Sequence, residues 1–205
     1  MAISMSEDTY TQGLTWPEYL QQMTVNRQRI LQVLDAIHPD EEEIAAARAA
    51  AEAHPGPLHI LVMTEDWCGD AVVNVPVAVR LAEVLPNAQL RLFIRSQHPD
   101  LQAAYADEDV WSIPVISIFD GTWREIARFV EQSEEVRRRK EQWMSQFPQA
   151  PRWRASTDPE EKKRWTRLMA RRLRDMMSWY KEGMWKSTWR ALLQDMQRAG
   201  KRAHI

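Results

Sequence analysis

The single cysteine of the chain, Cys68, is the residue best suited to chemistry, because it lies between a strand-like run and a stretch that can begin a helix. Residues 59–63 are apolar enough for a buried parallel strand, and the polar residues Thr64, Glu65 and Asp66 end that run. A cysteine at a helix N-terminus lies near free backbone N–H groups and the positive end of the helix dipole, and both favour the thiolate. The pattern therefore indicates a nucleophilic thiol in a tight turn.

Carboxylates near Cys68 act in the opposite direction. Glu65, Asp66 and Asp70 lie within three residues of the cysteine, and nearby negative charge disfavours formation of a thiolate. The sequence leaves the sign of the net pKa shift open. The alternative interpretation is that Cys68 is a small buried hydrophobic residue, which is the usual role of a lone intracellular cysteine.

Two motifs give the chain a family resemblance. The tetrapeptide Trp-Cys-Gly-Asp at 67–70 resembles the Trp-Cys-Gly-Pro-Cys active-site motif of the thioredoxin superfamily, and Pro76 stands where thioredoxins carry a helix-kinking proline. Ile113-Pro114, ahead of a strand-like run, resembles the segment in which thioredoxins hold a cis peptide bond opposite the active-site cysteine. The resemblance implies an α/β, thioredoxin-like fold: a central mixed β-sheet flanked by helices, with additional N- and C-terminal helices.

Two positions depart from the thioredoxin pattern. Ala71 occupies the place of the second cysteine, which resolves mixed disulfides in a dithiol thioredoxin. Val62 stands where thioredoxins have a buried aspartate that assists proton transfer to that second cysteine. The resemblance therefore implies a monothiol protein that forms no internal active-site disulfide.

The resemblance implies two functions of different classes. In the first, Cys68 is the catalytic residue of a monothiol thiol-disulfide oxidoreductase, which attacks a protein disulfide or a low-molecular-weight mixed disulfide and depends on an external thiol to resolve the product. In the second, the chain is a non-catalytic binding module with a thioredoxin fold. The two differ in whether Cys68 is exposed and acidic or buried and inert.

The substrate-binding residues are expected around the cysteine. By resemblance, Trp67, Ile113 and Pro114 form an apolar groove that docks the substrate, and the cis proline leaves a backbone edge for a short β-like contact. Gly69 lets another chain approach closely, and Asp70 belongs to the same turn.

No further motif predicts a cofactor or a metal. The five histidines show no ligand spacing with one another or with Cys68, and none of the six glycines forms a phosphate-binding loop. A variant that holds an iron–sulfur cluster, as similar monothiol glutaredoxins do, is disfavoured because their typical serine is missing. We expect no cofactor and no metal.

The composition is that of an ordinary globular protein, with 44% hydrophobic and 27% charged residues. No apolar run approaches the roughly 18 residues needed to cross a bilayer, and no secretory signal is visible at the start. A single cysteine fits a reducing compartment. We expect a cytoplasmic protein without membrane contact.

Charge is distributed unevenly along the chain. Residues 1–123 contain 18 acidic and 6 basic side chains, whereas residues 124–205 contain 21 basic and 11 acidic ones. We interpret this as two solvated faces of opposite sign, or as a basic C-terminal layer packed on an acidic body. A nucleic-acid surface is the less favoured alternative, because charge runs usually serve as solvated faces.

Helical patterns precede the thioredoxin-like region. Thr15 and Glu18 form a capping box, which opens a helix predicted to continue to Ile37. A second helix is predicted over 41–53. Residues 1–55 are therefore expected to be an N-terminal helical extension packed on the core.

The core is expected over residues 56–130, with the element order strand, helix, strand, helix, strand, strand and then helix, as in thioredoxins. Residues 71–85 are rich in valine and contain a proline, so propensity alone favours a strand or a broken element, whereas the resemblance implies a kinked helix. Asp120-Gly121 indicates a hairpin between the last two strands.

Residues 131–205 are predicted to form a basic, tryptophan-rich helical extension. The pattern gives a helix from Ser133 to Phe147, a linker over 148–151, a long helix capped by Asp158, and a last helix that ends before Gly200.

A glycine, Gly183, is expected to break the long helix. Seven of the ten tryptophans lie at or beyond Trp123, and we assign them to helix packing. The alternative is a face for a second copy of the chain or for another protein partner.

Overall fold

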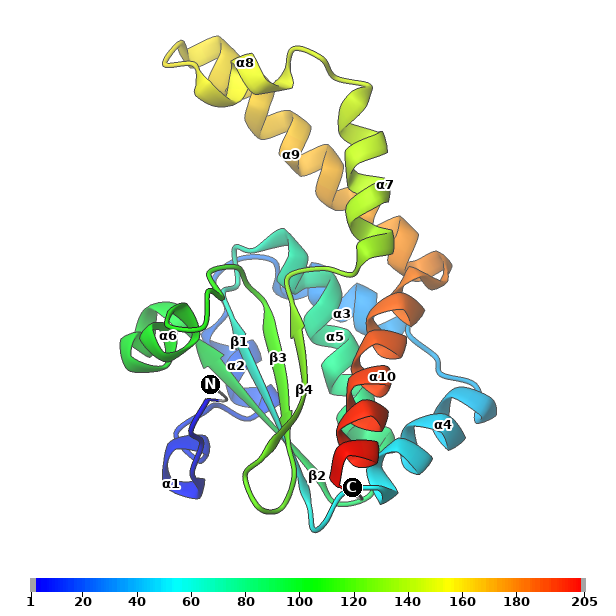
Figure 1. Cartoon of the computed structure of the whole chain (residues 1–205). Coiled ribbons are helices and arrows are strands. Elements are labelled where there is room, and N and C mark those ends of the chain that lie inside the picture. The colour runs from blue at the N-terminus through cyan, green and yellow to red at the C-terminus, as the bar shows by residue number, and fades with distance from the viewer. Residues whose placement is uncertain (1–2, 204–205) are drawn as a thin grey trace.

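A four-stranded sheet is the centre of the computed structural model, which describes residues 3–203 (Figure 1). The strand order is β2-β1-β3-β4; β1 and β2 are parallel, and the other two pairs are antiparallel. The predicted mixed sheet with flanking helices is therefore confirmed. The strands are β1 (Leu58–Thr64), β2 (Ala88–Ile94), β3 (Val115–Phe119) and β4 (Glu125–Val130).

Helices surround the sheet and continue beyond it. The order of elements within residues 58–145 is the predicted one. The helices are α1 (Glu7–Tyr10), α2 (Trp16–Gln22), α3 (Arg27–Asp35), α4 (Glu41–Glu52), α5 (Gly69–Val84), α6 (Pro99–Ala106), α7 (Glu134–Ser145), α8 (Ala150–Ala155), α9 (Pro159–Trp179) and α10 (Trp185–Ala203).

The two faces of the sheet pack into separate cores. In β1, Ile60 and Val62 belong to a large core shared with α5 and the C-terminal helices, whereas Leu61 and Met63 belong to a smaller core with α1 and α6. Successive side chains of a strand point to opposite faces, so both faces of β1 are buried. This explains why the run is apolar without alternation.

Helix α5 forms although its sequence favours a strand. Its valines are buried between the sheet and the outer helices, and Pro76 lies inside the helix. Burial therefore overrides the intrinsic propensity of the β-branched residues. The resemblance predicted this segment correctly, and the propensity argument was wrong.

The first predicted helix is interrupted, because α2 ends at Gln22 and α3 begins at Arg27. Asn26 between them has a left-handed backbone conformation with φ 61°. The backbone N–H groups of Thr24 and Val25 donate to the Asp66 carboxylate instead of continuing a helix. The prediction of one helix to Ile37 was wrong, since this long-range contact is invisible in the local pattern.

The C-terminal helices differ from the prediction in two places. Helix α8 begins at Ala150, within the segment expected as a linker, and α10 continues through Gly200 to Ala203. A Cβ on Gly200 would lie 2.9 Å from the Cβ of Ala53, so the glycine permits close packing rather than ending the helix. The cap at Asp158 and the break at Gly183, with φ 110°, are confirmed.

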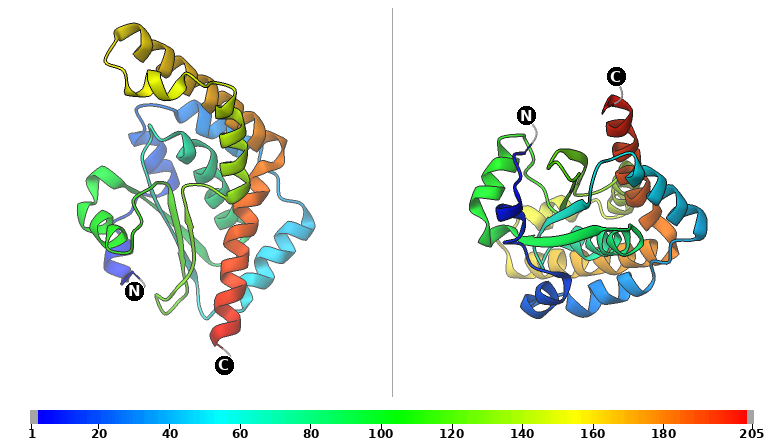
Figure 2. Two further views of the ribbon diagram at one scale, coloured as in Figure 1. Left: turned by 45° about the horizontal axis from the view of Figure 1, so that its top comes forward. Right: turned by 90° about the horizontal axis from the view of Figure 1, so that it is seen from below.

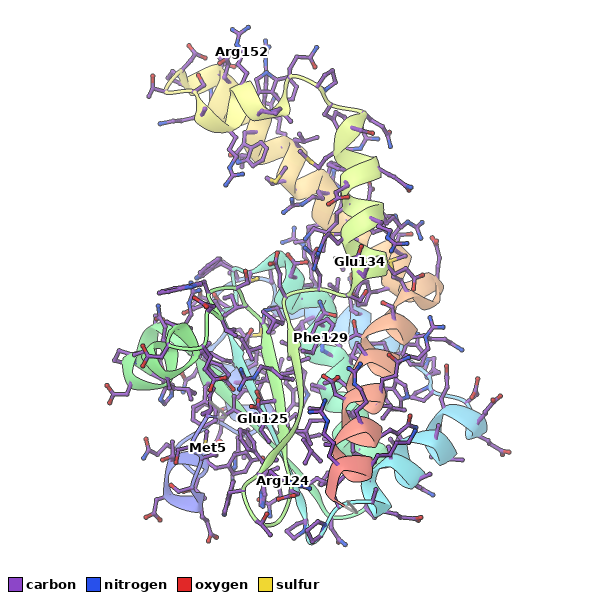
Figure 3. All side chains as sticks on the ribbon, viewed as in Figure 1. Met5, Arg124, Glu125, Phe129, Glu134 and Arg152 are labelled. Atoms are coloured by element: carbon purple, nitrogen blue, oxygen red, sulfur yellow. The ribbon has the colours of Figure 1, made fainter. Side chains whose placement is uncertain are left out.

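Three of these helices form a helical arm, residues 134–179, which projects from one end of the body (Figures 1 and 2). Glu134 lies at its base and Arg152 near its far end (Figure 3). The Trp143 indole N–H donates to the Asp175 carboxylate at 2.7 Å, which joins α7 to α9. The chain then returns along the body as α10.

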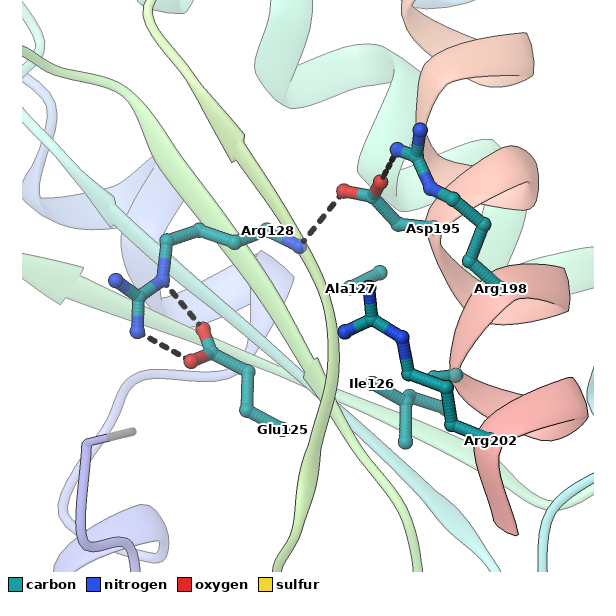
Figure 4. Close-up of a pocket in the computed structure, with 8 residues that line it drawn as sticks. Glu125, Ile126, Ala127, Arg128, Asp195, Arg198 and Arg202 are labelled. Atoms are coloured by element: carbon teal, nitrogen blue, oxygen red, sulfur yellow. Dashed lines mark hydrogen bonds and ion pairs between the residues drawn. The ribbon is translucent and has the colours of Figure 1, made fainter. Parts of the chain in front are cut away.

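Both outer strands of the sheet are covered. At β2, Leu14 and Leu92 exchange two backbone hydrogen bonds of 2.8 Å. Gly13 permits this approach, since a Cβ there would lie 2.4 Å from the Phe93 ring. At β4, α10 lies alongside the strand, and Asp195 accepts a hydrogen bond of 3.4 Å from the Arg128 backbone N–H (Figure 4). Covering removes the free backbone groups that an additional strand would bind.

Candidate functional site

Cys68 lies between β1 and α5, as the N-cap residue of the helix. Its side chain is half-buried, and Sγ donates a hydrogen bond of 3.5 Å to the carbonyl oxygen of Ile113. The peptide bond between Ile113 and Pro114 is cis. The structure therefore brings together three of the residues that the sequence nominated, although 45 positions separate Cys68 from Ile113.

Burial raises the pKa of the Cys68 thiol above its ordinary value. The negative charges of Asp70 and Glu131 act in the same direction, whereas hydrogen bonds from the backbone N–H groups of Ala71 and Asp70 lower the pKa by a smaller amount. The sign that the sequence left open is therefore upward, and at neutral pH the resting group is the thiol.

Asp70 forms a buried ion pair with the arm. Both of its carboxylate oxygens accept hydrogen bonds from Lys140 Nζ of α7, at 3.0 and 3.1 Å, and both side chains are 11% exposed. Burial raises the pKa of Asp70, and the charge of Lys140 lowers it by a smaller amount. The carboxylate nominated as part of a substrate groove thus ties the cysteine turn to the arm.

Gly69 also faces the arm. A Cβ built on this glycine would lie 3.6 Å from Cδ1 of Leu173 on α9, which is ordinary van der Waals contact. The side of the turn next to Gly69 is therefore bordered by α9, so a partner that reaches Cys68 from there also meets Leu173.

Asp66 has a structural role that the sequence did not reveal. Its carboxylate accepts hydrogen bonds from the backbone N–H and the hydroxyl of Thr24, at 2.7 and 2.9 Å, and from the Val25 N–H at 3.1 Å. Its carbonyl oxygen accepts from the Asn26 amide at 2.8 Å. Although partial burial raises the pKa of Asp66, these backbone hydrogen bonds outweigh it, and the net shift is downward. Asp66 thus fixes the cysteine turn to the break between α2 and α3.

Replacing Asp66 with alanine is expected to lower the free energy of unfolding by about 1–3 kcal/mol at neutral pH, because the donors of Thr24 and Val25 lose a charged acceptor. A depressed native pKa gives stability that is present above the unfolded pKa and lost as pH falls through the native value. Urea unfolding at several pH values should therefore show the difference shrinking in acid. A difference that stays constant down to strongly acidic pH would contradict this assignment.

Exposed apolar side chains gather around the cysteine turn. The large apolar residues classed as exposed in the described part of the chain are Val25, Trp67 and Trp111, which are 46%, 58% and 68% exposed. Trp67 precedes the cysteine, Trp111 precedes the Ile113 carbonyl by two residues, and the Val25 backbone is bound by Asp66. Only Trp67 among these three was nominated from the sequence.

Arg95 connects the two exposed tryptophans. Its guanidinium carbon lies 5.8 Å from the centroid of the Trp67 ring, and Nη1 donates to the Trp111 carbonyl oxygen at 3.4 Å. The sequence contains no local signal for this arrangement, because Arg95 follows β2 whereas the tryptophans belong to two other loops.

A buried polar cluster attaches α5 to the C-terminal helices. Asn74 Oδ1 accepts hydrogen bonds from the Tyr180 hydroxyl at 2.8 Å and the Thr188 hydroxyl at 2.7 Å. Asn74 Nδ2 donates to the carbonyl oxygens of Asp70 and Glu131, at 3.1 and 3.0 Å. All the hydrogen-bonding capacity of the Asn74 amide is therefore used, and the cluster extends to Asp70 of the cysteine turn.

A second cleft lies between β4 and α10 and is lined by charged side chains (Figure 4). Glu125 pairs with Arg128, Asp195 pairs with Arg198, and Arg202 also lines the cleft. The cysteine does not line it, so it is separate from the site described above.

Within residues 3–203, no group of three His, Cys, Asp or Glu side chains is arranged to hold a metal ion. Over the same residues, no helix combines the length and the apolar character needed to cross a membrane.

A mixed sheet with β1 leading into an N-terminal cysteine on α5, and a cis proline opposite that cysteine, defines a thioredoxin-like fold. The family model described as thioredoxin matches residues 13–144, which is more than half of the chain. The chain therefore belongs to the thioredoxin family. The match begins at the glycine that packs against β2 and ends within α7.

Two solved structures resemble the whole chain. One is the crystal structure of an HIV epitope-scaffold, with 13% identity, a TM-score of 0.62, and coverage of 95% of this chain and 99% of that one. The other is a protein of unknown function from Pseudomonas aeruginosa, with 17% identity, a TM-score of 0.56, and coverage of 98% and 99%. At these identities the likeness shows the fold alone. Among curated proteins, no match to the chain was found.

Proposed function

We propose that the chain is a thioredoxin-like monothiol thiol-disulfide oxidoreductase in which Cys68 is the nucleophile. The observation that carries the proposal is the half-buried Cys68 thiol against the cis Ile113–Pro114 peptide, in a turn bordered by the exposed apolar side chains of Val25, Trp67 and Trp111. Tryptophan is typical of the residues that anchor protein contacts, and packing within one chain gives no reason to leave two of them in water. A partner protein that docks over Cys68 would cover these tryptophans and so explains their exposure.

The proposed reaction exchanges one thiol for another. The Cys68 thiolate attacks one sulfur of the partner disulfide, a bond forms between Sγ and that sulfur, and the second partner sulfur leaves as a thiolate. An external thiolate then attacks the partner's sulfur in this mixed disulfide and releases the Cys68 thiolate. The external thiol is required because Ala71 supplies no second sulfur. The reducing conditions of the cytoplasm would supply it.

The raised pKa of Cys68 sets the expected kinetics. At neutral pH few molecules carry the thiolate, so attack is slow. As long as the pH is below the pKa of Cys68, the rate of attack rises about tenfold for each unit by which the pH is raised. A thiol of high pKa is also a poor leaving group, so resolution by expulsion of Cys68 is slow. We therefore propose that mixed disulfides on Cys68 are long-lived.

We expect the alkylation of Cys68 by iodoacetamide to have a midpoint above the usual cysteine pKa of about 8.5, with the Cys68→Ser variant as the blank. Incubation with glutathione disulfide at alkaline pH should give one stable adduct per chain, measured by intact mass. If iodoacetamide labels Cys68 while no disulfide forms an adduct at any pH, thiol-disulfide exchange is excluded.

A non-catalytic binding module is the second candidate. The specific observations in its favour are the raised pKa of Cys68 and the hydrogen bond from its thiol to the Ile113 carbonyl. Under this candidate the exposed tryptophans would bind a partner equally well in the Cys68→Ser variant. Equal partner binding by that variant, together with no adduct, would favour the module.

A further inference from the structure

We propose that Trp67, Arg95 and Trp111 form a subsite, next to Cys68, for a polypeptide segment that carries a carboxylate beside a bulky apolar side chain. The inference rests on the proposed function, since it specifies which partners reach the thiol most readily. It concerns residues from three separate loops, of which the cysteine motif supplies only Trp67.

The geometry of Arg95 is the first argument. Its guanidinium lies 5.8 Å from the Trp67 ring centroid, while one nitrogen, Nη1, is held by the Trp111 carbonyl oxygen at 3.4 Å. A cation–π contact with an aromatic face leaves N–H donors of a guanidinium available, and these donors match a carboxylate in a bidentate arrangement. Arg95 is thus held in place while other N–H groups of its guanidinium can donate hydrogen bonds to a ligand.

The charge around Arg95 is the second argument. Within the described residues, Arg95 has no carboxylate at ion-pair distance, and the two carboxylates that precede Trp67 in the cysteine turn have other donors. Glu65 accepts from the Ser96 backbone N–H at 2.7 Å, and Asp66 accepts from Thr24 and Val25. A half-buried arginine beside the exposed Trp67 ring is therefore complementary to an anion supplied from outside the chain.

The apolar surface is the third argument. Trp67 and Trp111 are 58% and 68% exposed, and Arg95 joins their two loops through the Trp67 ring and the Trp111 carbonyl oxygen. Tryptophan and arginine are the residue types most enriched among interface hot spots, where a few side chains supply most of the binding energy. An exposed aromatic ring beside a cation fits an apolar side chain and an acidic one that are neighbours in sequence.

The test compares two aromatic disulfide probes of different charge. Dithiobis(nitrobenzoate) carries a carboxylate on each ring, dithiodipyridine is neutral, and each releases a coloured thiol when Cys68 attacks. In the Arg95→Gln variant, the rate with the anionic probe should fall about twofold to fivefold relative to the rate with the neutral probe. Arg91→Gln, which removes an arginine from the preceding strand, is the matched control and should leave the ratio of the two rates unchanged. An unchanged ratio in Arg95→Gln, or an equal fall in Arg91→Gln, would overturn the subsite.

A second measurement separates the subsite from the chemistry. In the Cys68→Ser protein, titration with nitrobenzoate should shift the indole N–H NMR signals of Trp67 and Trp111, assigned through Trp→Phe variants, and Arg95→Gln should abolish the shift. If wild-type Cys68 reacts with neither probe but these shifts occur, thiol exchange fails and the subsite stands. If Cys68 reacts but nitrobenzoate shifts neither signal, the subsite fails and thiol exchange stands.

Discussion

Replacing Lys140 with methionine is expected to lower the free energy of unfolding by about 3–5 kcal/mol, because the buried Asp70 carboxylate loses its cation. Lys140 Nζ lies 3.0 and 3.1 Å from the two Asp70 oxygens, and both side chains are only 11% exposed. Urea unfolding at neutral pH, followed by circular dichroism, measures the loss. A loss of this size is large for a substitution in α7, which lies outside the sheet. It is expected because the ion pair joins α7 to the turn that holds the cysteine.

Two further variants test whether the loss of stability comes from the ion pair. The double variant Asp70→Asn with Lys140→Met removes both charges and is expected to recover more than half of the lost stability. Arg138→Met removes an exposed cation of the same helix and should change the stability by less than about 0.5 kcal/mol. A double variant as unstable as Lys140→Met would assign the loss to packing of the lysine stem instead of the ion pair.

Replacing Asn74 with alanine is expected to lower the free energy of unfolding by about 3–5 kcal/mol, because several buried groups each lose a partner worth about 1–3 kcal/mol. The Tyr180 and Thr188 hydroxyls both donate to Asn74 Oδ1, and the carbonyl oxygens of Asp70 and Glu131 both accept from its amide. Urea unfolding measures the loss, and hydrogen exchange should show faster opening of α10.

The control for this prediction removes the orphaned donors. In the Asn74→Ala background, Tyr180→Phe and Thr188→Val together should restore part of the stability, since no buried hydroxyl is then left without its acceptor. In the wild-type background the same two substitutions should destabilise the protein. If Tyr180→Phe with Thr188→Val changed the free energy of unfolding by the same amount in both backgrounds, the three side chains would not act as one cluster.

The fold could be predicted because its signals are local or carried by motifs. The apolar run of β1, the hairpin at Asp120-Gly121 and the cap at Asp158 each occur within a few residues of the feature they determine. Helix α5 could be predicted only from the resemblance, since its valines favour a strand and burial decides the outcome. The break after α2 could not be predicted, because it depends on Asp66, about 40 residues away.

In the candidate site, the residues that belong to motifs could be predicted and the others could not. Cys68, Ile113 and Pro114 were nominated from two motifs, and the structure places them together. Arg95 and Trp111 were missed because an arginine after a strand and a tryptophan in a loop have no recognisable spacing. The partner of Asp70, Lys140, lies 70 positions away in α7, and the basic run of that helix indicated a solvated face or a layer packed on the acidic body without pairing any two residues.

The covered edge of β4 has a consequence for the order in which the chain is made. Asp195 and the rest of α10 protect this strand, yet they follow it by more than 50 residues in the sequence. During synthesis from the N-terminus, the sheet therefore has an open edge until the last helix has left the ribosome. An open edge is where partly made chains can pair with one another, so aggregation of such chains is an expected hazard in producing this protein.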